Sequence, residues 1–179
     1  MNTISITQRA EQTKLAMEVH QHATIARVRM TRAKLTAELE DEAGPEPAVG
    51  VRFQFRSKPL PAPEGTLRIE VSFQMIGVAE GEGAEEERKA DPAVLVDCAF
   101  AADYELAADF AIRPEHVKAF KDGNAIFNVW PYFREFLQSS LQRMGLPPLT
   151  APFLRLEVKR EGGPVKERAR KAGASVSPD

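Results

Sequence analysis

The stretch Leu67-Arg-Ile-Glu-Val-Ser-Phe-Gln-Met75 carries the clearest strand pattern in the chain. Its odd-numbered residues are apolar, and its even-numbered residues are polar or charged. Because successive side chains of a strand point to opposite faces, this alternation predicts a strand with one buried face and one solvated face. The fold is therefore built around a sheet whose core lies on one side.

Three neighbouring stretches show the same alternation and predict further strands. They are Val51–Arg56, Val94–Leu106 and Ile25–Leu39. In the last of these, the apolar residues change from one parity to the other near Thr31–Arg32. One inserted residue moves every following side chain to the opposite face, so we expect a bulge or bend at this point.

After Leu106 the apolar spacing changes from two residues to about 3.6, which predicts helices. We expect a short helix from Pro114 that stops at Gly123, then a second helix with Asn124 as its cap and Gly145 at its end. The remainder predicts a proline-stiffened segment, LPPLTAP, and a short final strand from Leu154. Strands followed by helices indicate an α+β fold, a four-stranded antiparallel sheet with helix packed on one face.

The expected organisation is one domain with a polar segment at each end. Residues 1–22 are interpreted as a loosely ordered polar arm or short helix, 23–160 as the domain, and 161–179 as a disordered basic tail.

Composition excludes several classes of protein. The chain has 179 residues, a net charge of −2 and one cysteine. It lacks the basic surplus of a general nucleic-acid binder, a second cysteine for an internal disulfide, and an apolar run long enough to cross a bilayer. The polar start does not resemble a secretory signal, so we expect a soluble, cytoplasmic protein without membrane insertion.

The residues that most often carry catalysis or bind metals give weak patterns here. His20 and His22 would share a face only on a strand, and the third ligand would be His116 or a remote carboxylate. Cys98 falls on the apolar parity of its strand and is interpreted as core. Asp97, Asp103 and Glu105 share the other parity and are interpreted as a solvated face. No nucleotide-binding or hydrolase motif occurs, so we predict no enzyme activity, no metal and no cofactor.

Two other features suggest a binding protein. The first strand carries a basic series, which is interpreted either as protection of an edge strand or as an electrostatic docking surface for an acidic partner: Arg27, Arg29, Arg32 and Lys34. The second helix carries aromatic residues on a wider surface than packing on one sheet requires. That width predicts a second contact, with another subunit or with a bound apolar chain.

The segment Asn124-Ala-Ile-Phe-Asn-Val-Trp-Pro-Tyr-Phe-Arg-Glu135, followed by Gly145-Leu-Pro-Pro-Leu-Thr-Ala-Pro152, resembles the SecB family of export chaperones. The family carries an aromatic-Pro-Tyr-x-Arg-Glu core and, about a helix later, a Gly-aromatic-Pro-x-Leu segment with a further proline. The four strands that precede these motifs agree with the family fold over about residues 20 to 152. The resemblance implies protomers that pair into a homotetramer, a dimer of dimers, and ATP-independent holding of unfolded polypeptides in hydrophobic grooves.

Within this resemblance, residues are assigned to two apolar sites. The expected oligomer interface is Phe127, Trp130, Phe133 and Leu137. The expected client-binding groove is Phe53, Phe55, Phe73, Trp130, Phe133, Leu137, Leu141, Met144, Leu146, Pro147 and Leu149. SecA is the partner of the family in export systems. The basic first strand and basic tail depart from the acidic surfaces used there, so a dedicated partner such as an antitoxin or a single regulator is the alternative.

Overall fold

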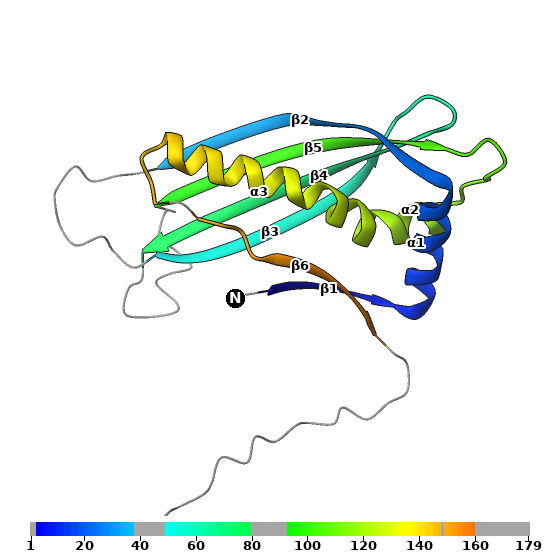
Figure 1. The fold of residues 1–179 in the computed structure, drawn as a ribbon, viewed down its shortest axis with the longest axis horizontal. Helices are drawn as coiled ribbons and strands as arrows, with labels where there is room; N and C mark the ends of the chain where they lie inside the picture. Colours follow the sequence, from blue (N-terminus) through cyan, green and yellow to red (C-terminus); the bar gives the residue numbers. More distant parts are fainter. Residues whose placement is uncertain (1–2, 38–48, 80–92, 148, 160–179) are drawn as a thin grey trace, which may run out of the picture.

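The computed structural model describes residues 3–37, 49–79, 93–147 and 149–159 (Figure 1). The expected tail at 161–179 lies outside these ranges. Within these ranges, ten elements follow one another: β1 (Thr3–Arg9), α1 (Ala10–His22), β2 (Ala23–Ala37), β3 (Val49–Leu60), β4 (Thr66–Ala79), β5 (Val94–Leu106), α2 (Pro114–Phe120), the π-helical turn η1 (Lys121–Ala125), α3 (Ile126–Arg143) and β6 (Phe153–Lys159).

The main sheet has the order β2-β5-β4-β3, and every neighbouring pair is antiparallel. Helix α3 lies across one face of this sheet (Figure 1). The predicted α+β fold, with a four-stranded antiparallel sheet and a helix packed on one face, is confirmed. Strands β2 and β3 follow each other in sequence but form the two opposite edges. Pro59 is tolerated in β3 because an edge strand does not need every backbone donor.

The predicted bulge in β2 is confirmed. The register with β5 shifts between Met30 and Arg32, which leaves Thr31 as the extra residue. Its hydroxyl donates to the carbonyl of Ala99 at 3.2 Å, so this carbonyl has a hydrogen-bond partner at the bulge. A second shift between Ile25 and Arg27 has no counterpart in the sequence prediction.

The helical half of the chain is continuous where the sequence predicted a break at Gly123. Helix α2, turn η1 and helix α3 run into one another, and Gly123 lies buried inside η1. A Cβ atom at Gly123 would clash with the Gln8 side-chain amide, so glycine is needed for close packing rather than to stop a helix. Gly145, in contrast, ends α3 as predicted. It has φ of 75°, and the Leu146 amide donates to the Leu141 carbonyl at 3.0 Å.

The first 22 residues differ from the expected loose arm. Residues 3–9 form β1, and the following helix α1 buries Ala16 and Val19 against the rest of the protein. The short helix considered for this region is present, whereas the strand before it was not predicted. The chain's final strand β6 was predicted, and it pairs with β1 in a two-stranded parallel sheet.

The core lies between α3 and the face of the sheet that α3 covers. The odd-numbered apolar residues of β4 and the even-numbered residues of β5 supply most of it, as their alternation predicted. None of the helices in the described ranges is long and apolar enough to span a bilayer.

Candidate functional site

The buried face of α3 is centred on an aromatic cluster. Phe133 stacks on Phe73 of β4 with ring centroids 4.6 Å apart, and Trp130 meets the same ring edge-on at 5.7 Å. Phe53 and Phe55 of β3 approach Trp130 at 6.4 Å each. These are ordinary aromatic packing geometries, so the cluster fixes the helix on the sheet.

The Trp130 ring also joins α3 to the segment that leads into β6. Its indole N–H donates to the Pro152 carbonyl at 3.1 Å. Nearby, the Arg134 guanidinium lies over the Phe153 ring, 5.0 Å from its centroid, and its Nε is buried without a hydrogen-bond partner. The width of the aromatic surface, which predicted a second contact, is therefore explained in part by this chain's own C-terminal segment.

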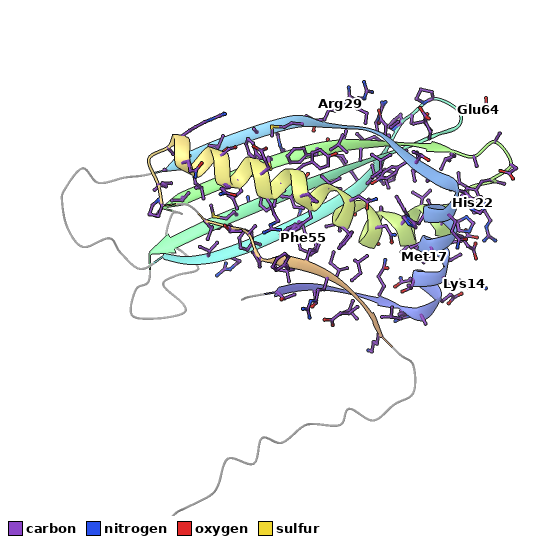
Figure 2. The ribbon with its side chains drawn as sticks, viewed as in Figure 1. Lys14, Met17, His22, Arg29, Phe55 and Glu64 are labelled. Atoms are coloured by element: carbon purple, nitrogen blue, oxygen red, sulfur yellow. The ribbon has the colours of Figure 1, made fainter. Side chains whose placement is uncertain are left out.

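The structure places five of the predicted client-binding residues inside the protomer's own core. Their side chains are buried and contact the sheet, so they are not available to a client in this conformation: Phe73, Trp130, Phe133, Leu137 and Leu141. Among the other members of that set, Pro147 is exposed. The remaining five are half-buried and stay as predicted contacts: Phe53, Phe55, Met144, Leu146 and Leu149. Phe55 projects from β3 toward the side of β6 in Figure 2.

The predicted oligomer interface divides in the same way. Trp130, Phe133 and Leu137 are buried within the protomer, whereas Phe127 is 46% exposed. Tyr132, on the opposite flank of α3, is 47% exposed and was not among the predicted interface residues. An interface on this helix therefore has Phe127 on one flank and Tyr132 on the other as its available aromatic residues.

The helix-bearing face of β2 is an apolar surface that the prediction missed. Met30 and Leu35 pair with the core residues Phe100 and Val96 of β5, yet their own side chains are exposed. A helix is about 10 Å across, whereas four strands at a spacing of about 4.8 Å span about 15 Å. One helix therefore cannot cover the whole sheet, and the edge strand β2 keeps uncovered apolar residues.

A second apolar surface, partly covered by the core, belongs to the parallel pair of β1 and β6. Ile4 pairs with Leu154 and Ile6 with Leu156, so these four side chains share one face. Leu154 is buried, but Leu156 is 37% exposed and so is only partly covered. Together, the β2 surface and this ribbon place apolar side chains on elements either side of α3.

The outer face of the main sheet is charged and internally paired. Arg27 contacts Asp103 at 2.7 Å, and Arg32 contacts Asp97 at 2.9 Å. Arg68 hydrogen-bonds the same Asp103 carboxylate, and these bonds, first from Arg68 and then from Arg27, lower the pKa of Asp103 to about 2. The basic residues of β2 and the acidic residues of β5 thus form cross-strand ion pairs.

Of the four predicted docking residues, Arg27 and Arg32 take part in these pairs. Arg29 and Lys34 lie on the same strand with exposed side chains, and Arg29 stands at the upper border of the sheet in Figure 2. A cavity of about 280 Å³ on the sheet is lined by Arg32, Arg56 and Asp97, together with uncharged residues of β3 and β4. Edge protection and docking of an acidic partner both stay as predictions for this series.

The candidates for chemistry do not form a reactive site. Burial raises the pKa of the Cys98 thiol to about 12, so the thiol stays protonated at neutral pH. His20 and His22 lie on α1, where residues two apart do not share a face, which removes the reason for a metal site there. His22 stacks on Phe110 at 4.6 Å, and buried His116 hydrogen-bonds Glu18 at 3.0 Å. Within the ranges that the structure describes, no cluster of metal-binding residues occurs.

Comparisons with known proteins agree with the shape of the fold. No protein-family model and no curated protein matches the sequence. Among solved structures, the chain is similar to the SecB-like chaperone Rv1957 of Mycobacterium tuberculosis, solved in complex with a ChAD peptide from the HigA1 antitoxin. The TM-score is 0.60 at 18% sequence identity, and the match covers 80% of this chain and 96% of the other. The chain therefore has a SecB-like fold.

A second solved structure, a protein of unknown function from Streptococcus agalactiae, matches with a TM-score of 0.42 and 9% identity. That match covers 73% of this chain and 97% of the other.

Proposed function

We propose that this chain is an ATP-independent holdase chaperone that binds unfolded or non-native polypeptides. The observation that carries the proposal is the uncovered apolar surface on a SecB-like fold. Met30 and Leu35 on β2 and Leu156 on β6 are apolar, exposed and placed on extended backbone. Free strand edges beside apolar side chains suit an extended client, because backbone hydrogen bonds and adaptable apolar contacts require little sequence specificity.

The proposal includes self-association into a homotetramer, a dimer of dimers. Strand β2 runs for 15 residues and forms an edge of the sheet. Its uncovered apolar face, together with the exposed Tyr132 and Phe127 of α3, supplies contact area for sister subunits. Light scattering coupled to size exclusion tests this, since the 19.8 kDa chain would elute with about four times its mass.

The decisive experiment is suppression of aggregation without nucleotide. A chemically denatured client is diluted into buffer with increasing amounts of this protein, and light scattering is followed. We expect suppression to be complete near a stoichiometric ratio and unchanged by added ATP. A folded, correctly assembled protein that leaves client aggregation unaltered would remove the holdase proposal.

A second candidate function is the dedicated binding of one partner. The structural neighbour was solved with a peptide from an antitoxin, which supports a partner of this kind for the same fold. Affinity capture from lysate of the source cell distinguishes the candidates. Many substoichiometric chains favour the general holdase, and a single stoichiometric partner favours the dedicated one.

Docking of SecA and a role in export are not part of the proposal. The charged residues of β2 that face the outer side of the sheet are all basic: Arg27, Arg29, Arg32 and Lys34. Two of them, Arg27 and Arg32, are paired with aspartates of β5. This surface suits an acidic partner better than a basic one. Binding of purified SecA, measured by calorimetry, would support a role in export.

A further inference from the structure

Besides its pairing with β6, strand β1 is held by Gln8 and by partial packing of Ile4 and Ile6 against the core. The two strands form a sheet of their own, and an isolated two-stranded ribbon is marginally stable in water. Only Gln8 of β1 is buried, and its side-chain amide donates to the Ala119 carbonyl at 2.8 Å. Ile4 and Ile6 are half-buried. The strand is therefore anchored at one end and weakly covered along the rest.

Strand β6 has apolar surface that β1 does not cover. Its ribbon face continues from Leu154 through Leu156 to Val158, and the last of these side chains is 50% exposed. The β1 residue opposite Val158 is Gln8, whose side chain turns to Ala119. An apolar residue at that position of a bound strand would cover surface that β1 leaves open.

The sequence of β1 contains nothing that makes it a specific partner of β6. Thr3-Ile-Ser-Ile-Thr7 alternates β-branched apolar residues with small polar ones, and its partner groups on β6 are backbone amides and carbonyls in a regular register. Any extended segment with the same alternation can form the same backbone bonds, because those bonds carry no sequence information.

We propose that the β6 edge is a polypeptide-binding edge, which β1 occupies in this structure and from which an extended client segment displaces it. The occupant is an extended chain with apolar residues at alternate positions. This inference rests on the proposed function and names its binding site. Because β1 is tethered, it competes at an effective concentration on the order of millimolar. A client at micromolar concentration must therefore bind the edge roughly a thousandfold better than β1. The added contacts are with Val158 and with the part of Leu156 that Ile6 leaves exposed.

A reversible cross-link between β1 and β6 tests the displacement. Ser5 and Arg155 are register partners with exposed side chains, so Ser5→Cys with Arg155→Cys places two thiols on the outer side of the ribbon. The matched control is Lys58→Cys with Glu70→Cys, a register pair on β3 and β4. The native Cys98 is buried and does not compete. Binding is measured with fluorescent α-lactalbumin that has been reduced and carboxymethylated, because this probe stays unfolded and inert to reductant.

We expect oxidation of the ribbon pair to weaken binding of this probe at least tenfold and reduction to restore it, with less than a twofold change in the control pair. Equal affinity of the oxidised and reduced ribbon variant would overturn the inference while leaving the holdase function intact.

A second measurement does not depend on client binding. The single variant Arg155→Cys is incubated under conditions that form disulfides with a synthetic Thr3–Arg9 peptide that carries Ser5→Cys. The peptide is used at about 10 mM, so that it exceeds the millimolar effective concentration of the tethered β1. We expect mixed disulfide with this peptide in clear excess over a scrambled peptide of the same composition. Equal yields would mean that β6 does not accept a strand in place of β1. If the peptide reacts selectively but the unfolded probe never binds, the edge exists and the proposed function is wrong.

Discussion

Replacing Phe133 by alanine tests whether this residue belongs to the protomer core or to an oligomer interface. The Phe133 side chain is fully buried within one chain, stacked on Phe73 and within 5.2 Å of the Trp130 ring centroid. If these contacts are what the residue does, its loss must destabilise each protomer, whatever the state of assembly.

The expected magnitude follows from the burial. Removing a fully buried phenylalanine costs about 3–5 kcal/mol, which includes the cavity left behind. About 1 kcal/mol of this is the stacking with Phe73. For a domain of this size, urea unfolding has a slope of about 2 kcal/mol per molar, so the midpoint should fall by about 2 M. A domain with a total stability of about 10 kcal/mol would stay folded after this loss but be visibly weakened.

The assay is urea unfolding at several protein concentrations, with Gln138→Ala as the control. Gln138 lies on the same helix but is exposed and belongs to neither proposed apolar site, so its truncation should cost less than about 1 kcal/mol. The reasoning is refuted if Phe133→Ala changes the free energy of unfolding by less than about 1 kcal/mol while the molecular mass falls, because that pattern belongs to an intersubunit contact.

Three further outcomes are expected. Asp103→Asn should lower the free energy of unfolding at neutral pH. This deficit against the parent should shrink as pH falls from about 4 toward 2, because the folded carboxylate has its pKa lowered to about 2 and loses its arginine pairs only on protonation. A deficit that stays constant in urea titrations over this pH range contradicts the ion-pair account. Gly123→Ala should displace the Gln8 amide and speed hydrogen exchange of residues 3–9. The free energy of global unfolding should change by about 1 kcal/mol or less, because the higher helix propensity of alanine offsets the loss of the Gln8 hydrogen bond. Unaltered exchange of residues 3–9 would show that Gln8 does not anchor β1. Trp130→Phe should cost about 1–2 kcal/mol in urea unfolding through loss of the bond to the Pro152 carbonyl, and a neutral result would show that this bond does not fix the segment before β6.

The sequence predicts the main sheet well because its signals are local. Alternation over Leu67–Met75 and Val94–Leu106 reports on each strand by itself, and the parity change locates the bulge at Thr31 without knowledge of the partner strand. The α3 terminus at Gly145 is equally local, since it depends on one residue that adopts positive φ.

The missed features depend on residues that are distant in sequence. Strand β1 has Thr3, Ser5 and Thr7 outward and pairs with a strand far along the chain, so its local sequence was interpreted as a polar arm. Gly123 signals a helix end locally, and only the approach of Gln8 gives it another use.

The candidate site shows the same division. The aromatic residues around Trp130 were recognised as important, but sequence does not reveal which of them one chain covers by itself. That division depends on the helix being narrower than the sheet and on where β6 passes, and both are properties of the assembled fold. Exposure of Met30 and Leu35 therefore became visible only in three dimensions.

The parallel pairing of β1 and β6 has a consequence for the order of folding. Thr3 pairs with Phe153, 150 positions later, so this ribbon has the longest-range contacts of any strand pair described. Closing a loop of that length costs about 4 kcal/mol in chain entropy, which a seven-residue ribbon recovers only once the central sheet is already in place. During synthesis the first strand must wait for nearly the whole chain to emerge, and over that interval it is itself an unpaired, aggregation-prone segment of the kind that this protein is proposed to protect.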